Sequence, residues 1–355
     1  MSKVMFALAT FIAGTGFNIS GIQNALFASV CFVAAGVIAV WAILTAAKAE
    51  LSRKNKWLLI VLVTAGVIFS ILLTRAEQSG RRQRDQLAIR VAELESVNKG
   101  LVQMGSPVLQ VRLAGITSLV TTALESDSER GEIMRTFVSY LHDSARYPVQ
   151  QWERQPRFCT ERTDPCQQER LSTPTPSDMQ AILNGIKSFQ ELNPQANLRF
   201  EEIDFKKGSL RGTDLRSVTF YRTNLRCFQM REANLNDAHI SNSNLAWSDF
   251  EYTVGPVTFT DCDLTGAQFS DATLKCVGDK CTRFVGTSLV RAKFHTADLR
   301  GATFVGTDVG CAVFDNANLA GADLSGAQHL DCKQIQRSAT KPEDVKLPTY
   351  LNDCR

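Results

Sequence analysis

The distribution of apolar residues divides the chain into an apolar N-terminal part and a longer, more polar remainder. Two uncharged apolar runs, Ala25–Ala47 and Trp57–Thr74, are separated by a short basic turn. A helix needs about 20 consecutive apolar residues to cross a bilayer. We therefore expect a transmembrane helix hairpin over residues 25–74, preceded by an N-terminal apolar segment over residues 1–24.

Helical periodicity continues beyond the apolar part and predicts a helical connector over residues 75–146. Its first stretch repeats apolar residues at alternating steps of four and three, a short heptad stripe. Either this helix packs on its own domain, or it forms a parallel coiled coil that makes the chain a homo-oligomer. The stripe comprises Leu87, Val91, Leu94, Asn98 and Leu101.

Two pairs with capping-box spacing, Ser126/Glu129 and Ser177/Gln180, mark the starts of later helices. Residues 147–176 lie largely between these helices and are polar and proline-rich, which is typical of a linker. The second pair begins an amphipathic stretch, so we expect a capping helix over residues 177–194.

From Phe200 onward, a large apolar residue recurs at every fifth position, and a small residue usually stands two places before it. This period matches neither a helix nor a flat strand. A square coil explains it: each unit forms one side and one corner, and turns of about 20 residues stack about 4.8 Å apart. Asp or Asn often precedes the large residue and suits a corner. We place a one-residue phase slip at 251–254, with the series resuming at Val254, and an inserted loop at Lys275–Arg283.

Segments such as LNDAH and NLAGADLSGA resemble the pentapeptide-repeat family. The resemblance extends from about residue 107 to 351, because the helical segment before the repeat, PSDMQAIL and QIQRSATKPEDVKLPTYL also look like parts of such proteins. It implies a right-handed quadrilateral β-helix over 198–330, closed by a C-terminal cap over 331–355. The predicted fold is thus two transmembrane helices, a small α-helical region and a pentapeptide-repeat solenoid.

Ten cysteines and a net charge of +3 leave the compartment open. The pairs Cys159/Cys166, Cys276/Cys281 and Cys332/Cys354 lie close in sequence and would suggest disulfides in an oxidising compartment. The distribution of basic residues and the resembled family favour a multi-pass protein of the bacterial inner membrane with its solenoid in the cytoplasm. The periplasm is the alternative, and we leave the pairing open.

No catalytic constellation, cofactor motif or metal-ligand spacing is evident in the sequence. Charge on the predicted coil is segregated, however, and its first turns are basic. Residues about 20 apart should stack, which brings like charges together. Either this is a solvated face, or it binds lipid headgroups or nucleic acid. The anion-binding candidates are Lys206, Arg211, Arg226 and Arg231.

These features favour a non-enzymatic, membrane-anchored binding or scaffold protein. Its partners would be the lipid bilayer and a protein that the sequence does not identify. The alternative function is a membrane-perturbing effector of an antiphage (abortive infection) or toxin system, suggested by a small helix pair joined to a binding domain.

Overall fold

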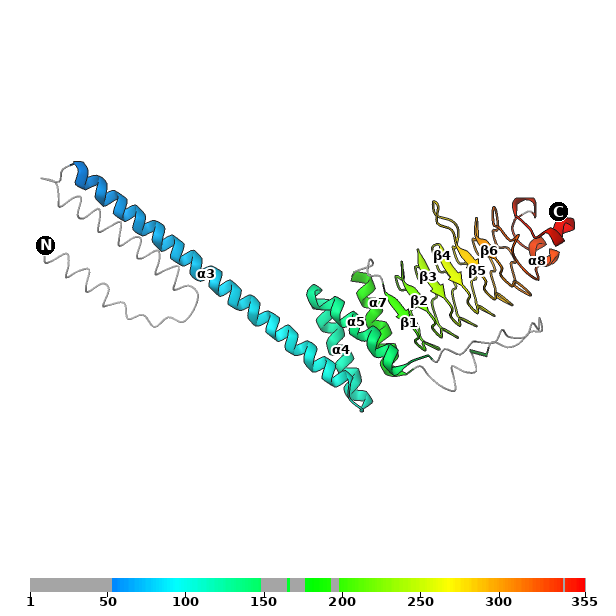
Figure 1. The fold of residues 1–355 in the computed structure, drawn as a ribbon, viewed down its shortest axis with the longest axis horizontal. Coiled ribbons are helices and arrows are strands. Elements are labelled where there is room, and N and C mark those ends of the chain that lie inside the picture. The colour runs from blue at the N-terminus through cyan, green and yellow to red at the C-terminus, as the bar shows by residue number, and fades with distance from the viewer. Residues whose placement is uncertain (1–52, 148–164, 167–175, 193–197, 341, 355) are drawn as a thin grey trace. The chain divides into compact units, whose positions relative to one another are not determined.

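The computed structural model describes residues 53–147, 165–166, 176–192, 198–340 and 342–354 (Figure 1). The chain divides into two compact units, Met1–Ala92 and Glu93–Arg355, and each is considered by itself. The predicted segment 1–24, the first predicted span and most of the predicted linker lie outside the described residues.

A single helix, α3, runs from Arg53 to Met104. No proline interrupts it before Pro107, so the helix continues across the boundary that we predicted after Thr74. The prediction of two membrane-spanning helices is corrected here. None of the described helices combines the length and the apolar composition that a bilayer crossing requires. Taken over its whole length α3 is not apolar, because charged side chains recur from Arg75 onward. The membrane-perturbing effector stays a prediction.

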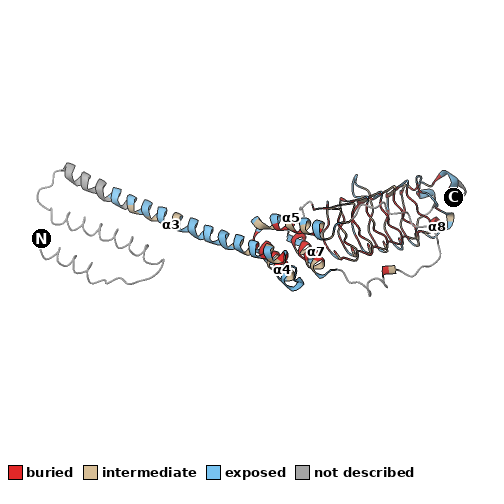
Figure 2. Cartoon of the chain, turned by 60° about the horizontal axis from the view of Figure 1, so that its bottom comes forward, coloured by how far each residue is buried: buried red, intermediate tan, exposed pale blue. Residues whose placement is uncertain are grey.

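Three shorter helices form one end of the second unit: α4 (Leu109–Glu125), α5 (Asp127–Ser144) and α7 (Ser177–Leu192). Their buried faces meet one another and the first strand, as the red inner faces in Figure 2 show. The last turns of α3 cross α4 closely, because a Cβ added at Gly115 would lie 2.7 Å from the Gly100 carbonyl oxygen.

The predicted solenoid is present as a succession of coils with one short strand each, joined into a single parallel sheet in sequence order (Figure 1). Partners in the sheet are mostly 20 residues apart, as Phe200 and Phe220 show. In each strand the large residue points inward and its neighbours point outward. The strands are β1 (Arg199–Glu201), β2 (Thr219–Tyr221), β3 (Ala238–Ser241), β4 (Val257–Thr260), β5 (Arg283–Val285) and β6 (Thr303–Val305).

The interior of the coil is filled by the predicted series of large residues, which are buried, with Val254 as the exception. Phenylalanine rings stack from coil to coil in two columns that meet edge to edge. The first column is Phe250, Phe269, Phe294 and Phe314, with neighbouring ring centroids 4.8, 4.8 and 5.2 Å apart. The second is Phe259, Phe284 and Phe304, with centroids 5.3 and 5.0 Å apart.

The corners behave as the Asp and Asn residues predicted. Asn224 Oδ1 accepts a hydrogen bond from the Arg226 N–H at 3.2 Å, and Asp204 Oδ1 accepts one from the Lys206 N–H at 3.1 Å. Such Asx turns let the chain bend sharply without unpaired backbone groups. The residue after the bend adopts a left-handed conformation, for example Cys227 with φ of 59°.

Two coils depart from the regular length. Val254 is 41% exposed, so our placement of the phase slip at 251–254 is wrong by a few residues. Gly255 takes the inward position, and the shortened unit comes after it, since Ile240 pairs with Phe259 only 19 positions later. The coil from Phe259 to Phe284 is longer and contains the predicted loop.

Both ends of the solenoid are covered. At the first coil, the Tyr147 N–H donates to the Glu202 carbonyl oxygen at 2.7 Å, and the Asp204 N–H donates to that of Ala145. At the last coil, the Leu324 N–H donates to the Lys346 carbonyl oxygen at 2.8 Å. The C-terminal cover contains α8 (Cys332–Gln336) and the short 3-10 helices Pro342–Asp344 and Thr349–Cys354.

The predicted capping boxes are not formed as expected. Ser126 is the N-cap of α5, but its hydroxyl contacts Ser128 instead of the helix backbone. Gln180 turns away from the start of α7, and its side-chain amide both donates to and accepts from the backbone of Ser209. This amide therefore provides hydrogen-bonding partners for the backbone N–H and carbonyl oxygen of Ser209 on the first coil, and it does not cap its own helix.

Candidate interaction surfaces of the solenoid

The outward face of the parallel sheet carries an ordered row of polar side chains. The strand register aligns the first outward residue of each strand with that of the next strand. Exposed basic or imidazole side chains alternate along this row with half-buried threonines. Because coils stack at about 4.8 Å, the row is a ladder with a fixed spacing. In order, it comprises Arg199, Thr219, His239, Thr258, Arg283 and Thr303.

A groove of about 780 Å³ lies along this row. Its floor is the ladder from Arg199 to Arg283, and one wall is the inserted loop, the yellow hairpin that projects beyond the coils in Figure 1. A Cys276–Cys281 disulfide closes the loop. Lys280 of the loop forms an ion pair with Asp237 at the groove floor, which anchors the wall.

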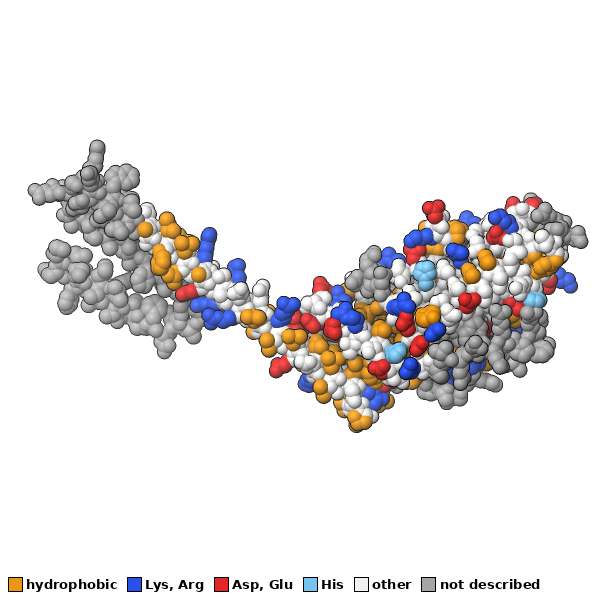
Figure 3. Space-filling view, in the orientation of Figure 1, with side chains coloured by type: hydrophobic (Ala, Val, Ile, Leu, Met, Phe, Trp, Pro, Cys, Tyr) orange, Lys and Arg blue, Asp and Glu red, His pale blue; other side chains and the backbone are white. Residues whose placement is uncertain are grey.

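Charges in the groove are partly compensated. Arg199 forms an ion pair with Glu201, and Asp237 is neutralised by Lys280. Within the described part of the chain, the Arg283 guanidinium has no ion-pair or hydrogen-bonding partner, and the imidazole of His239 has none either. Asp279, on the exposed loop, is the acidic group that faces this end of the groove. Elsewhere on the solenoid face in Figure 3, basic and acidic side chains are interspersed.

The basic cluster predicted from the sequence is stacked as expected but extends over two faces. The bridge between Asp204 and Asn224 places Lys206 beside Arg226. The bridge between Ser209 and Gln229 places Arg211 beside Arg231 on the next face. The cluster is therefore two stacked pairs around one corner of the coil.

Two members of the cluster are paired with acids of the following coil. Arg211 contacts Glu232 at 2.8 Å, and Arg231 contacts Glu251 at 2.5 Å. The Arg231 guanidinium also lies over the Tyr252 ring, 4.7 Å from its centroid. These contacts reduce the positive charge available to a ligand, and anion binding by the cluster stays a prediction.

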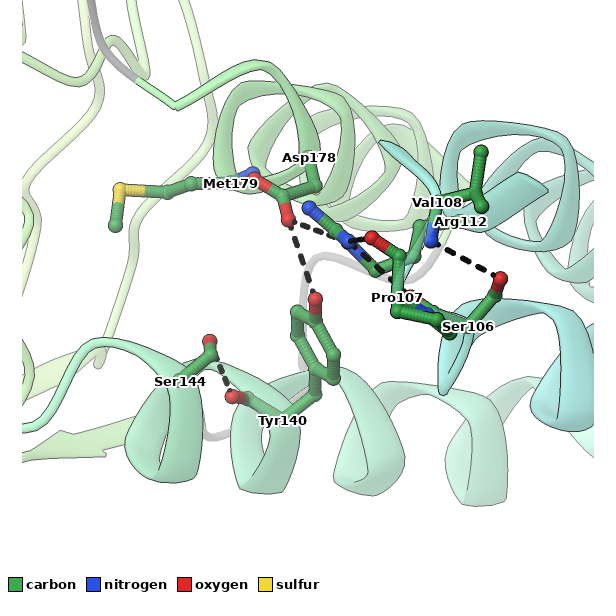
Figure 4. Close-up of polar contacts among 8 residues, drawn as sticks. All are labelled: Ser106, Pro107, Val108, Arg112, Tyr140, Ser144, Asp178 and Met179. Carbon is green, nitrogen blue, oxygen red and sulfur yellow. Dashed lines mark hydrogen bonds and ion pairs between the residues drawn. The ribbon is translucent and has the colours of Figure 1, made fainter. Parts of the chain in front are cut away.

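A polar node joins the helices that cover the first coil (Figure 4). Asp178 of α7 accepts hydrogen bonds from Arg112 of α4 at 3.0 Å and from the Tyr140 hydroxyl of α5 at 3.2 Å. Arg112 also donates to the backbone carbonyls of Ser106 and Pro107. Burial, followed by the nearby Asp178 carboxylate, raises the pKa of Tyr140. The node joins the helices of this cover.

Two titratable groups on the coils have pKa values that their structural surroundings shift. A hydrogen bond from Arg300 holds the pKa of Asp298 below its usual range. Burial raises the pKa of the Cys262 thiol to about 12, so this cysteine is not a nucleophile at neutral pH. Among the described residues, no group of His, Cys, Asp or Glu is arranged to hold a metal ion.

Disulfides in the described residues include one of the pairs that we considered and one that we did not. Cys276–Cys281 is bonded, whereas Cys166 is bonded to Cys227, across a sequence separation of 61. Cys311 and Cys332 are also disulfide-bonded, and Cys159 lies outside the described residues. Cys227 stands at an outward corner of the coil, where the repeat pattern alone does not reveal a partner.

Comparison with known proteins identifies the repeat. A family model for pentapeptide repeats matches in 8 copies, over residues 213–252, 280–310 and 297–328. The chain carries a pentapeptide-repeat domain. This assignment agrees with the buried five-residue series and with the square coil, and the matched residues lie within the solenoid and not in the helices that precede it.

Solved structures of pentapeptide-repeat proteins are similar to the solenoid at low sequence identity. Full-length QnrB1, a plasmid-mediated fluoroquinolone resistance protein, is 20% identical over 44% of this chain and 86% of its own, with a TM-score of 0.34. HetL from the cyanobacterium Nostoc, involved in heterocyst differentiation regulation, is 18% identical over 47% of this chain and 97% of its own, with a TM-score of 0.16. No significant match to a curated protein is found.

Proposed function

We propose that this pentapeptide-repeat protein is a non-enzymatic binding or scaffold module that holds a partner protein on the outer faces of its solenoid. Solenoids present extended surfaces whose shape is set by coil stacking. The observation that carries the proposal is the sheet face, where the strand register holds six outward side chains in one row above a continuous buried core. A surface of this kind needs little ordering when it binds, which favours affinity.

Site-specific photo-crosslinking tests this function in the native host. A photoreactive residue at Thr258 reports on the groove, and one at Lys293 reports on the face opposite the sheet, where that side chain is exposed. We expect one discrete adduct from Thr258 and at most diffuse products from Lys293. A discrete adduct from Lys293 alone would keep a binding function but move it to the other face. Failure of both positions to capture a defined partner would count against the proposal.

The disulfides support an oxidising compartment as the place where the solenoid acts. They involve six described cysteines: Cys166, Cys227, Cys276, Cys281, Cys311 and Cys332. The remaining described cysteine with a free thiol is Cys262, which is buried. Cytosolic proteins are kept reduced, so this much cross-linking is typical of proteins outside the cytosol. The cytoplasmic location expected from the sequence stays a prediction, and the disulfides are the observation that favours its alternative.

Thiol trapping in intact cells tests the compartment. Cells are quenched in acid, alkylated without reductant, and the chain is examined by mass spectrometry. We expect the Cys166–Cys227 and Cys276–Cys281 peptides to be recovered as disulfides. Recovery of these peptides as alkylated free thiols would place the solenoid in a reducing compartment.

A further inference from the structure

The groove on the sheet face has a direction, a spacing and a chemistry that together select a kind of partner. We infer that the groove binds an extended acidic peptide segment that lies along the solenoid axis, with carboxylates at every third residue. This inference rests on the binding function proposed above.

The direction of the ligand is set by the closed ends of the sheet. A peptide often binds a sheet by adding a strand to an open edge. Here, the first coil is paired with Ala145 and Tyr147, and the last coil is paired with Lys346. The covers at both ends therefore hinder the addition of a strand, whereas the groove from Arg199 to Arg283 lies across the strands on their outer face.

The spacing of the ladder matches a polyproline II chain. The cationic or imidazole positions Arg199, His239 and Arg283 recur at every second coil. Two coil steps amount to about 9.6 Å. Three residues of polyproline II make one turn of about 9.3 Å, so side chains three residues apart face the same way. The part of the ladder from Arg199 to Arg283, four coil steps or about 19 Å, accommodates about six such residues.

The chemistry of the groove favours a carboxylate and an unpaired peptide backbone. Arg283 offers a guanidinium without a partner in the described part of the chain, and guanidinium groups bind carboxylates by paired, charge-assisted hydrogen bonds. The hydroxyls of Thr219 and Thr258 also have no partner there. A polyproline II backbone has no internal hydrogen bonds, so its carbonyls can accept from these hydroxyls. Asp279 on the loop repels a carboxylate that enters from the loop side, which orients the peptide along the floor.

Fluorescence polarisation with the full chain tests this inference. The probe is a labelled peptide of three Glu-Pro-Ser repeats, and the control peptide has the same composition with its three glutamates adjacent. We expect the repeat peptide to bind at least severalfold more tightly. Arg283→Gln should weaken binding about tenfold, because it removes one charge-assisted contact. Arg300→Gln makes the same charge change on another face and should leave binding unchanged.

Three outcomes would overturn the inference. Equal binding of the two peptides would contradict the spacing. Equal loss in both arginine variants would show that only overall charge is sensed. Binding of polygalacturonate, with the same dependence on Arg283 but without peptide binding, would replace the peptide by an acidic glycan. Thr258→Val removes one hydroxyl without changing shape, and an unchanged circular dichroism spectrum of each variant shows that the fold is retained. If no probe binds but the Thr258 or Lys293 crosslinker still captures a protein, the groove ligand is wrong while the binding function stands.

Discussion

Replacement of Phe269 by alanine is the most informative perturbation of the solenoid. Its ring is fully buried and stands in the middle of the first phenylalanine column. It stacks on Phe250 and Phe294 at 4.8 Å and meets Phe259 and Phe284 edge to edge at 6.1 Å. The ring therefore joins three successive coils as well as the two columns.

The size of the effect is set by these contacts. A buried phenylalanine replaced by alanine costs about 3–5 kcal/mol, and the cost rises when the cavity cannot collapse. Collapse is hindered here because the coils on both sides are held by backbone hydrogen bonds, such as that from the Phe269 N–H to the Lys293 carbonyl oxygen at 2.7 Å. We expect a loss of about 4–5 kcal/mol in the free energy of unfolding. Phe314→Ala is the matched control, since Phe314 is equally buried but has two ring contacts instead of four. At about 0.5–1.5 kcal/mol for each aromatic contact, it should cost at least about 1 kcal/mol less.

Hydrogen exchange of the full chain, measured without reductant, provides the assay. The slowest amides of the coils report the free energy of the largest openings. Phe269→Ala should lower that energy for peptides on both sides of the substitution, because the ring joins neighbouring coils. Equal effects of the two substitutions, or a change below about 1 kcal/mol for Phe269→Ala, would refute the view that the stacked columns hold the coils together.

Further expectations concern single side chains. Leu299→Asp would bury an unpaired charge at a cost of several kcal/mol and should abolish soluble expression. Arg300→Gln changes the exposed neighbour and is the control. Equal soluble expression of the two variants would show that the assignment of inward and outward positions in the repeat is wrong. Arg300 lowers the pKa of Asp298, so the stabilisation that Arg300 provides should be present near neutral pH and disappear as the pH falls through the lowered pKa. Urea unfolding of wild type and Arg300→Gln as a function of pH measures this stabilisation. A difference in unfolding free energy that does not change with pH would contradict the expectation. The Cys262 thiol, with a pKa of about 12, should react with a thiol reagent only after unfolding, so native wild type and Cys262→Ser should show identical labelling. Asp178→Ala leaves two donors of the helical node without their acceptor, should cost about 1–3 kcal/mol, and should speed hydrogen exchange in α7; unchanged exchange there would show that the node is dispensable.

The sequence predicts the solenoid well because its interior is a local rule repeated many times. The five-residue period places each large residue from Phe200 to Leu324 inward, and only at the phase slip were two residues candidates for the inward position. Counting favoured apolar Val254 over Gly255 for the inward position. The backbone pairing between coils shows the opposite, since Val254 pairs with Asn234 at an outward position.

Interactions between coils were harder to predict than the coils. The basic cluster looked uncompensated along the chain, yet Glu232 and Glu251 reach Arg211 and Arg231 from the next coil. The ladder in the groove is likewise invisible in a linear scan, because its members lie a whole coil apart. A search at intervals of 20 residues would have found its first three members, Arg199, Thr219 and His239.

The extent of the helix over the second apolar run was misjudged, because this run was considered without the residues that follow it. The end of the second run at Thr74 was taken as the end of a helix. The backbone of α3 continues through the charged residues beyond it, since none of them interrupts helical hydrogen bonding. The limits of a helix therefore depend on the residues on both sides of an apolar run.

The bond between Cys166 and Cys227 also has a mechanical consequence. It closes a loop with a sequence separation of 61 that contains α7, β1 and β2. When tension is applied to the two ends of the chain, this loop is bypassed, and the load passes through the sulfur–sulfur bond. The covering helix and the first coils can then lose their shape without lengthening the tethered chain. After reduction, the same segment can release roughly 200 Å of extended chain, at about 3.3–3.6 Å per residue. The redox state of one bond thus decides whether this end of the solenoid behaves under force as a rigid link or as an extensible one.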